Sequence, residues 1–85
     1  MQKIEMCRKI TGLGQAGQCT LVYSVIEDSL DFGISIQITE IEEEETVLNI
    51  TRNETEIKEL CDMLASNFVT PIALRDVVYD WICAV

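Results

Sequence analysis

The sequence predicts an α+β domain in which a four-stranded, mostly antiparallel sheet (order ββββαα) is covered on one face by a C-terminal helix hairpin. Apolar and polar residues alternate with period two before residue 51, and apolar residues recur at helical spacing after residue 53. The links between the expected strands are too short for parallel crossovers. The 85 residues are 48% hydrophobic, which predicts a single domain over residues 1–85 and excludes intrinsic disorder.

Four strands are expected in order along the chain. Residues 3–10 alternate, a glycine-rich loop follows over 11–18, and residues 19–27 are rich in β-branched and aromatic side chains. The clearest alternation joins Phe32, Ile34, Ile36 and Ile38, and it predicts a strand with one buried face. A turn within 42–45 and a fourth strand over 46–50 complete the expected sheet.

Two helices are expected after the strands. Thr51 or Asn53 caps the first, and Pro71 lies in the first turn of the second, where its missing N–H is harmless. The apolar stripe of the first helix consists of Ile57, Leu60, Cys61, Leu64 and Phe68. That of the second helix consists of Leu74, Val77, Val78, Trp81, Ile82 and Val85. The opposite face of the second helix carries Asp76, Tyr79, Asp80 and Cys83.

The charge of the chain is strongly negative. Fifteen acidic residues stand against six basic ones, there is no histidine, and the formal net charge is −9. Such a chain is not expected to bind nucleic acid phosphates or anionic membranes directly. A cysteine nucleophile normally needs a histidine base, so no catalytic residue is expected and the protein is predicted to be non-enzymatic. The start of the sequence lacks the pattern of a secretory signal, so a cytoplasmic location is expected.

The four cysteines are Cys7, Cys19, Cys61 and Cys83. Their separations lack the close pairs of a zinc site, so we expect structural thiols and no metal or cofactor. Cys7 meeting Cys19 across a hairpin, and Cys61 meeting Cys83 across the helix pair, would nevertheless bring ligands together. A cysteine-held zinc or redox module therefore remains an alternative.

An acidic segment stands out at a predicted hairpin tip. It comprises Glu40, Glu42, Glu43, Glu44 and Glu45. One interpretation is a solvated turn that keeps the protein soluble and protects a sheet edge. The other is a negative prong that docks into a basic groove, of the kind that holds phosphates in nucleic-acid enzymes.

A second candidate surface lies on the last helix. Asp76 and Asp80 are one helical turn apart, and Tyr79 between them is a residue type common at interface hot spots. Together with the acidic segment, they predict a protein that acts by binding another protein. The sharpest form of this prediction is an inhibitor of a nucleic-acid-binding enzyme, of the anti-CRISPR type.

A small-molecule binding domain, with a pocket between sheet and helices, is the other alternative. Gly33 on the third strand permits either close approach of a ligand or a local twist or bulge, and we favour the twist or bulge.

Three stretches of the chain resemble a family of short bacterial proteins catalogued only as a domain of unknown function. These are Tyr23-Ser24-Val25, Phe32-Gly33-Ile34-Ser35-Ile36, and the run from Thr70-Pro71 to Tyr79-Asp80. The first 18 residues carry no specific match. The resemblance implies a cytosolic bacterial or phage-borne protein and carries over no activity.

Overall fold

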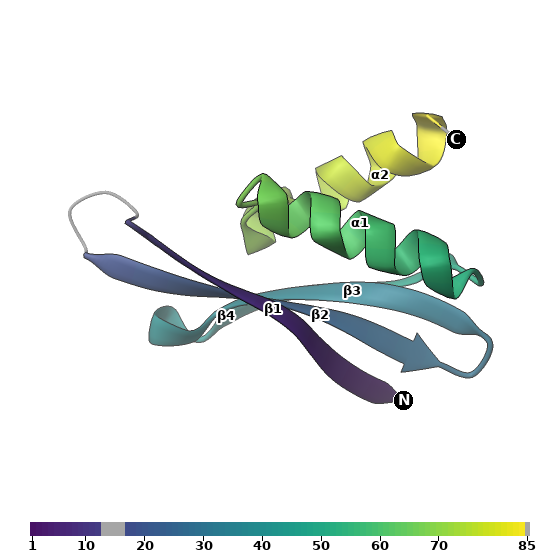
Figure 1. The fold of residues 1–85 in the computed structure, drawn as a ribbon, viewed down its shortest axis with the longest axis horizontal. Helices are drawn as coiled ribbons and strands as arrows, with labels where there is room; N and C mark the ends of the chain where they lie inside the picture. The colour runs from purple at the N-terminus through teal and green to yellow at the C-terminus, as the bar shows by residue number, and fades with distance from the viewer. Residues whose placement is uncertain (13–16, 85) are drawn as a thin grey trace.

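The computed structural model describes residues 1–12 and 17–84. Its strands are β1 (Gln2–Gly12), β2 (Gln18–Asp28), β3 (Asp31–Ile38) and β4 (Glu43–Thr51), and its helices are α1 (Glu54–Ser66) and α2 (Leu74–Ala84). Short 3₁₀ turns, η2 (Thr39–Ile41) and η3 (Pro71–Ala73), precede β4 and α2. Figure 1 shows the strands in one layer with both helices on the same side of it. Residues 13–16 of the expected loop and the expected apolar position Val85 lie outside the described residues.

The strands form one sheet in the order β1-β2-β3-β4, and every neighbouring pair is antiparallel. Four antiparallel strands followed by two helices confirm the predicted α+β class. That the two helices pack on each other as a hairpin stays a prediction. The turn expected within 42–45 is wrong, because β4 already begins at Glu43 and the connection from β3 lies at residues 39–42. Glu43, Glu44 and Glu45 pair with Ile38, Gln37 and Ile36 of β3, so three of the four consecutive glutamates lie within the sheet.

The hydrophobic core lies between one face of the sheet and the helices. Alternate residues of β2 and β3 point into it, as the period-two pattern predicted. The sheet contributes Cys19, Leu21, Tyr23, Val25, Ile34, Ile36 and Ile38. The helices contribute Ile57, Leu60, Cys61, Leu64, Ala65, Leu74 and Val78. The hydroxyl of Tyr23 donates a hydrogen bond of 2.9 Å to the carbonyl oxygen of Val69, which ties the link between the helices to the sheet.

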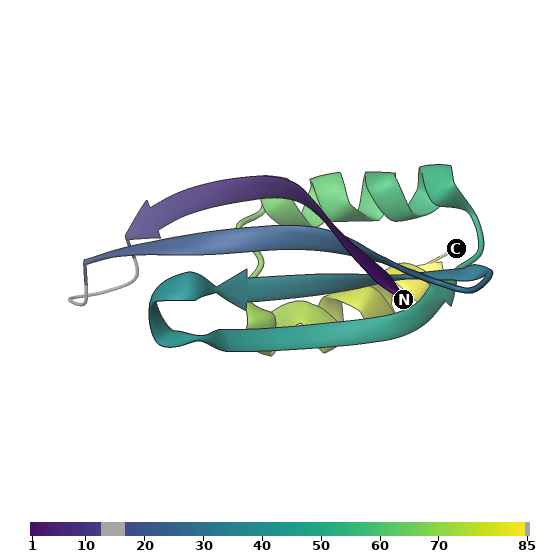
Figure 2. The ribbon, with the colours of Figure 1, turned by 90° about the horizontal axis from the view of Figure 1, so that it is seen from below.

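The second face of the sheet is partly covered by the start of β1. Val22, Ser24 and Ile26 alternate with the core residues of β2, yet they are also buried. Figure 2 shows the first half of β1 crossing obliquely in front of the other strands. Lys3 on this segment pairs with Glu44, whose carboxylate also accepts a hydrogen bond of 2.7 Å from the Ser35 hydroxyl.

A bulge in β4 explains the glycine in β3. Phe32 pairs with Thr51 but Ile34 pairs with Val47, so three residues of β4 lie opposite Gly33 alone. Asn49 within the bulge has a positive φ of 57°. A Cβ atom at Gly33 would lie 2.9 Å from the Cα of Leu48 and closer still to the carbonyl oxygen of Val47. Gly33 therefore admits the backbone of β4, so the local irregularity expected at this glycine is a bulge.

Helix α1 begins at a side-chain cap. The Oδ1 of Asn53 accepts a hydrogen bond of 3.0 Å from the backbone N–H of Glu56, so Asn53 and not Thr51 is the N-cap. The Thr51 hydroxyl donates instead to the Glu56 carboxylate at 2.8 Å. Both residues of the expected capping segment thus stabilise the first turn, in different ways.

The other end of α1 corrects one prediction. Phe68 does not continue the apolar stripe, because the helix ends at Ser66 and Phe68 adopts a left-handed conformation with φ of 52°. The Phe68 N–H donates to the Ala65 carbonyl, and the Val69 N–H donates to that of Leu64, as in a Schellman motif. Phe68 is 46% exposed, and the Nζ of Lys9 lies 5.9 Å from its ring centroid.

In α2, Leu74 and Val78 are buried, and Val77 and Trp81 pack half-buried against the core. Ile82 was expected on the apolar face but is 44% exposed, because it lines an open groove between α2 and β4 that no side chain of the described residues fills.

Candidate protein-binding surface

The basic side chains of the protein are all engaged within the chain. Five of the six form ion pairs, and the sixth, Lys9, lies over the Phe68 ring. The pairs are Lys3 with Glu44, Arg8 with Glu5, Arg52 with Asp31, Lys58 with Glu54, and Arg75 with Glu45. Five of the 15 side-chain carboxylates are thereby paired, so ten have no ion pair within the described residues. The excess surface charge is consequently carried by carboxylates.

The acidic segment is divided among three environments. Glu44 points to the second sheet face. Its hydrogen bond with Lys3, and to a smaller extent that with Ser35, lowers the pKa of its carboxyl. Glu45 points to the helix side and lies 3.4 Å from the Nη2 of Arg75. Glu43 is exposed at the start of β4. These three residues therefore belong to a strand and not to a hairpin tip.

The connection Thr39–Glu42, which we call the prong, forms the actual tip. Its Glu40 carboxylate accepts hydrogen bonds from the backbone N–H of Thr20 at 2.7 Å and from the Thr20 hydroxyl at 2.8 Å. These bonds lower the pKa of Glu40 to about 2, so this carboxylate is ionised at neutral pH. Glu42 closes the 3₁₀ turn with a left-handed φ of 54°. Non-glycine residues in this region carry strain, which often occurs at functional positions.

The prong carries an apolar residue that the sequence analysis did not single out. Ile41 lies between Glu40 and Glu42 and is 61% exposed. Ile10 of β1 pairs across the sheet with Thr20, the residue that holds Glu40, and it is 66% exposed. Glu40 thus has an exposed isoleucine next to it in the chain, and Thr20 has one opposite it in the sheet. The sequence signal was present, since Ile41 interrupts a run of glutamates, but the position of Ile10 depends on strand register.

The α2 candidates form a separate surface. Asp76, Tyr79 and Asp80 are exposed, as expected. Within residues 1–12 and 17–84, no hydrogen bond or ion pair joins them to the prong. Tyr79 lines a groove between α2 and β4, whereas neither aspartate does. The predicted set of protein-binding residues is therefore split between the prong, the strand β4 and the helix α2.

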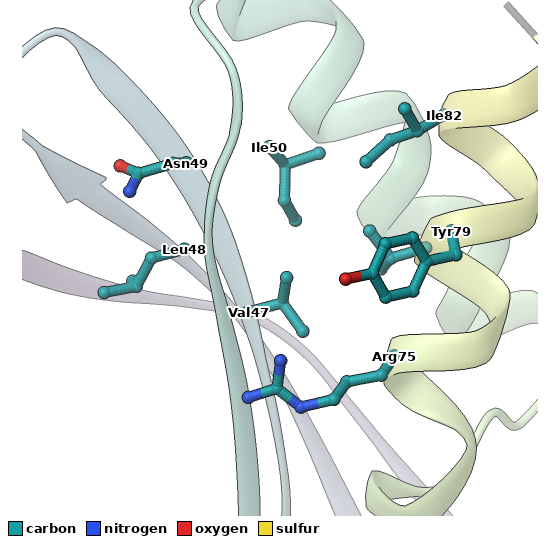
Figure 3. Close-up of a pocket in the computed structure, with 8 residues that line it drawn as sticks. Val47, Leu48, Asn49, Ile50, Arg75, Tyr79 and Ile82 are labelled. Carbon is teal, nitrogen blue, oxygen red and sulfur yellow. The ribbon is translucent and has the colours of Figure 1, made fainter.

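The groove beside Tyr79, called here the β4–α2 groove, has a volume of about 190 Å³. Its walls are formed by Val47, Ile50, Val78, Tyr79 and Ile82. In Figure 3, the Tyr79 ring and the side chains of Val47, Ile50 and Ile82 project into the space between strand and helix. Arg75 reaches across one end of it from α2 toward β4.

The cysteines do not come together as the zinc alternative requires. Cys7 pairs across the sheet with Tyr23, and Cys19 pairs with Thr11, so these two cysteines do not meet across the hairpin as the zinc alternative requires. Cys61 is buried and Cys83 is exposed. Burial is the main cause that raises the pKa of the Cys61 thiol to about 11, and the charge of Asp62 adds to it. In the described part of the chain, no group of three His, Cys, Asp or Glu residues is placed to hold a metal ion.

The fold and its surfaces define a small α+β protein with an anionic exterior and an apolar groove. The chain belongs to DUF6514, a family of unknown function, whose model matches residues 1–84. The match also covers the first 18 residues, for which the sequence motifs showed no resemblance. Searches of curated proteins and of solved structures found no match to the chain. None of the helices in the described residues is long and apolar enough to cross a membrane.

Proposed function

We propose that this protein acts without catalysis, by inserting the acidic prong into a basic groove of a partner protein. The observation that carries the proposal is the anchored tip, in which the Glu40 carboxylate is held by Thr20 while Ile41 stays exposed. A tip fixed before binding loses little conformational entropy when it docks. Ile41 supplies an apolar anchor, and the ionised Glu40 and exposed Glu42 supply the charge.

Electrostatics favour the same kind of partner. The ten carboxylates without an ion pair create a negative field that speeds the approach of a basic protein. Channels that hold nucleic acid phosphates are basic, so a nucleic-acid-binding enzyme is the proposed partner class. By occupying such a channel, the prong would inhibit the enzyme, as an anti-CRISPR protein does. The proposal places this binding in the cytoplasm of a bacterium, or of a bacterium infected by a phage.

The proposal is tested by photo-crosslinking in cells of the organism that encodes the chain. Ile41 is replaced by p-benzoylphenylalanine, and the control carries the same replacement at Ile72, an isoleucine that is 84% exposed on η3. We expect a nucleic-acid-binding protein to be crosslinked at position 41 and not at position 72. A crosslinking pattern that is equal at the two positions, or that contains no basic protein, would contradict the proposal.

The identified partner then allows a quantitative test. We expect affinity to fall as salt rises, and a competing oligonucleotide to release the protein from the channel. Glu42→Gln should weaken binding several-fold, whereas Glu59→Gln removes the same charge from the exposed face of α1 and should have a smaller effect. Equal losses in the two variants would mean that net charge alone matters, and would contradict docking by the prong.

A further inference from the structure

The β4–α2 groove is separate from the prong, and its lining is chemically simple. Val47, Ile50 and Ile82 are aliphatic, and Tyr79 adds an aromatic ring. Tyr79 is 64% exposed. The volume of about 190 Å³ is well below the ~300–1,000 Å³ of pockets for drug-sized ligands. The groove therefore suits a ligand with one ring or one branched chain.

Arg75 gives the groove a cation with unused hydrogen-bonding capacity. Its Nη2 contacts the Glu45 carboxylate and the Thr46 carbonyl oxygen, both at 3.4 Å. Charge-assisted hydrogen bonds are normally about 2.7–2.9 Å long, so both contacts are weak. A guanidinium has five N–H donors, and within the described residues no acceptor bonds to Nε or Nη1 of Arg75. The planar arrangement of these donors matches the two oxygens of a carboxylate.

We propose that the β4–α2 groove binds a small carboxylic acid with a single apolar group. The ligand carboxylate pairs with Arg75 at one end of the groove. The apolar group lies between Tyr79, Ile82 and Ile50. The positive charge of Arg75 selects a ligand with a negative charge, because Arg75 is the only cation among the lining residues. Glu45 is the group within the protein that competes with the ligand for Arg75. The site is independent of the proposed prong function.

The test is an NMR titration of the ¹⁵N-labelled protein with phenylacetate. We expect saturable shifts centred on the amides of Ile50, Tyr79 and Ile82. Phenylacetamide has the same shape without the negative charge, and we expect it to bind at least tenfold more weakly. Absence of saturable shifts with phenylacetate, or equal affinity for the two compounds, overturns the proposal.

Two further variants distinguish the Arg75 site from a merely apolar groove. Arg75→Lys keeps the charge but loses the forked donors, so we expect several-fold weaker binding of phenylacetate. Glu45→Gln removes the competing carboxylate and is expected to strengthen binding several-fold. Glu43→Gln makes the same charge change on the same strand, where no contact to Arg75 exists among the described residues, and should have a smaller effect. Unchanged affinity in Arg75→Lys, or equal gains in Glu45→Gln and Glu43→Gln, overturns the proposal. Glu42→Gln should leave this binding unchanged, so the site can fail or succeed separately from the prong.

Discussion

The carboxylate of Glu40 accepts a hydrogen bond of 2.7 Å from the backbone N–H of Thr20 and one of 2.8 Å from the Thr20 hydroxyl, although the two residues are 20 positions apart. The contact fastens the β3–β4 connection to β2. The contact also distinguishes Glu40 from the neighbouring glutamates, because the Glu40 carboxylate is hydrogen-bonded to two donors of Thr20. Glu40 thus has a structural role, because its contact with Thr20 holds the prong, including Ile41 and Glu42, in place.

This contact predicts a pH-dependent contribution to stability. The pKa of Glu40 is lowered to about 2 in the folded state from an ordinary value of 4.5. The contribution is therefore present above about pH 4.5 and is lost as the pH falls toward about 2. In thermal unfolding, we expect Glu40→Gln to lower the midpoint at pH 7, and the gap to the parent to close over this acidic range. Glu59→Gln is the control, and a gap for Glu40→Gln that does not change with pH would contradict the assignment.

The bulge opposite Gly33 predicts that even an alanine side chain at this position lowers the stability of the fold. In Gly33→Ala, the new methyl group would press on the backbone of Val47 and Leu48, which cannot move as a flexible side chain would. We expect a loss of about 1–3 kcal/mol in the free energy of unfolding, measured with urea. Gly12→Ala is the matched control because a Cβ there meets nothing within 4 Å. If both variants lost the same stability, the close approach of β4 would not be the reason for Gly33.

Much of this fold could be read from periodicity. The alternation from Phe32 to Ile38 and the helical spacing of Ile57, Leu60 and Leu64 reflect one buried face in each element, so they identified strand and helix correctly. Periodicity could not locate the turn before β4, because glutamate is compatible with both a turn and an exposed edge strand. It also could not place Phe68, whose spacing fits the helix although the chain has already left it.

The candidate site was less accessible from the sequence. Composition identified the glutamates, but their roles depend on contacts with Thr20, Lys3 and Arg75, which lie on other elements. Such pairings are set by strand register and helix placement, and local sequence does not encode them. The same holds for Ile10, which is the neighbour of Thr20 only because strand register places the two residues opposite each other.

The conformation of Phe68 predicts that glycine is better than alanine at this position. Both Phe68→Gly and Phe68→Ala remove the ring and its contact with Lys9, so comparing them isolates the backbone. A left-handed residue with a Cβ atom carries about 1–2 kcal/mol of strain, which glycine avoids. We expect the glycine variant to be more stable than the alanine variant by about 1 kcal/mol in urea unfolding. Equal stability would show that the left-handed turn is not maintained without the ring.

The hydrogen bond from Tyr23 to Val69 predicts a specific cost for removing one hydroxyl. In Tyr23→Phe, the carbonyl oxygen of Val69 loses its donor, and we expect about 1–2 kcal/mol less stability. Tyr79→Phe removes a hydroxyl from an exposed ring and should stay within about 0.5 kcal/mol of the parent. Similar losses in the two variants would mean that the bond does not stabilise the link between the helices.

The cysteines should differ sharply in reactivity, since a thiol reacts as its thiolate and must be reached by the reagent. Cys83 is exposed on α2, whereas Cys61 is buried and its pKa is raised to about 11, mainly by that burial. With Ellman's reagent at pH 8, we expect Cys83 to react in a fast phase and Cys61 only at the rate of unfolding. Cys83→Ser should remove the fast phase, and urea should accelerate the reaction of Cys61. Rapid modification of Cys61 in the folded Cys83→Ser variant would show that α1 opens from the sheet far more readily than its buried contacts imply.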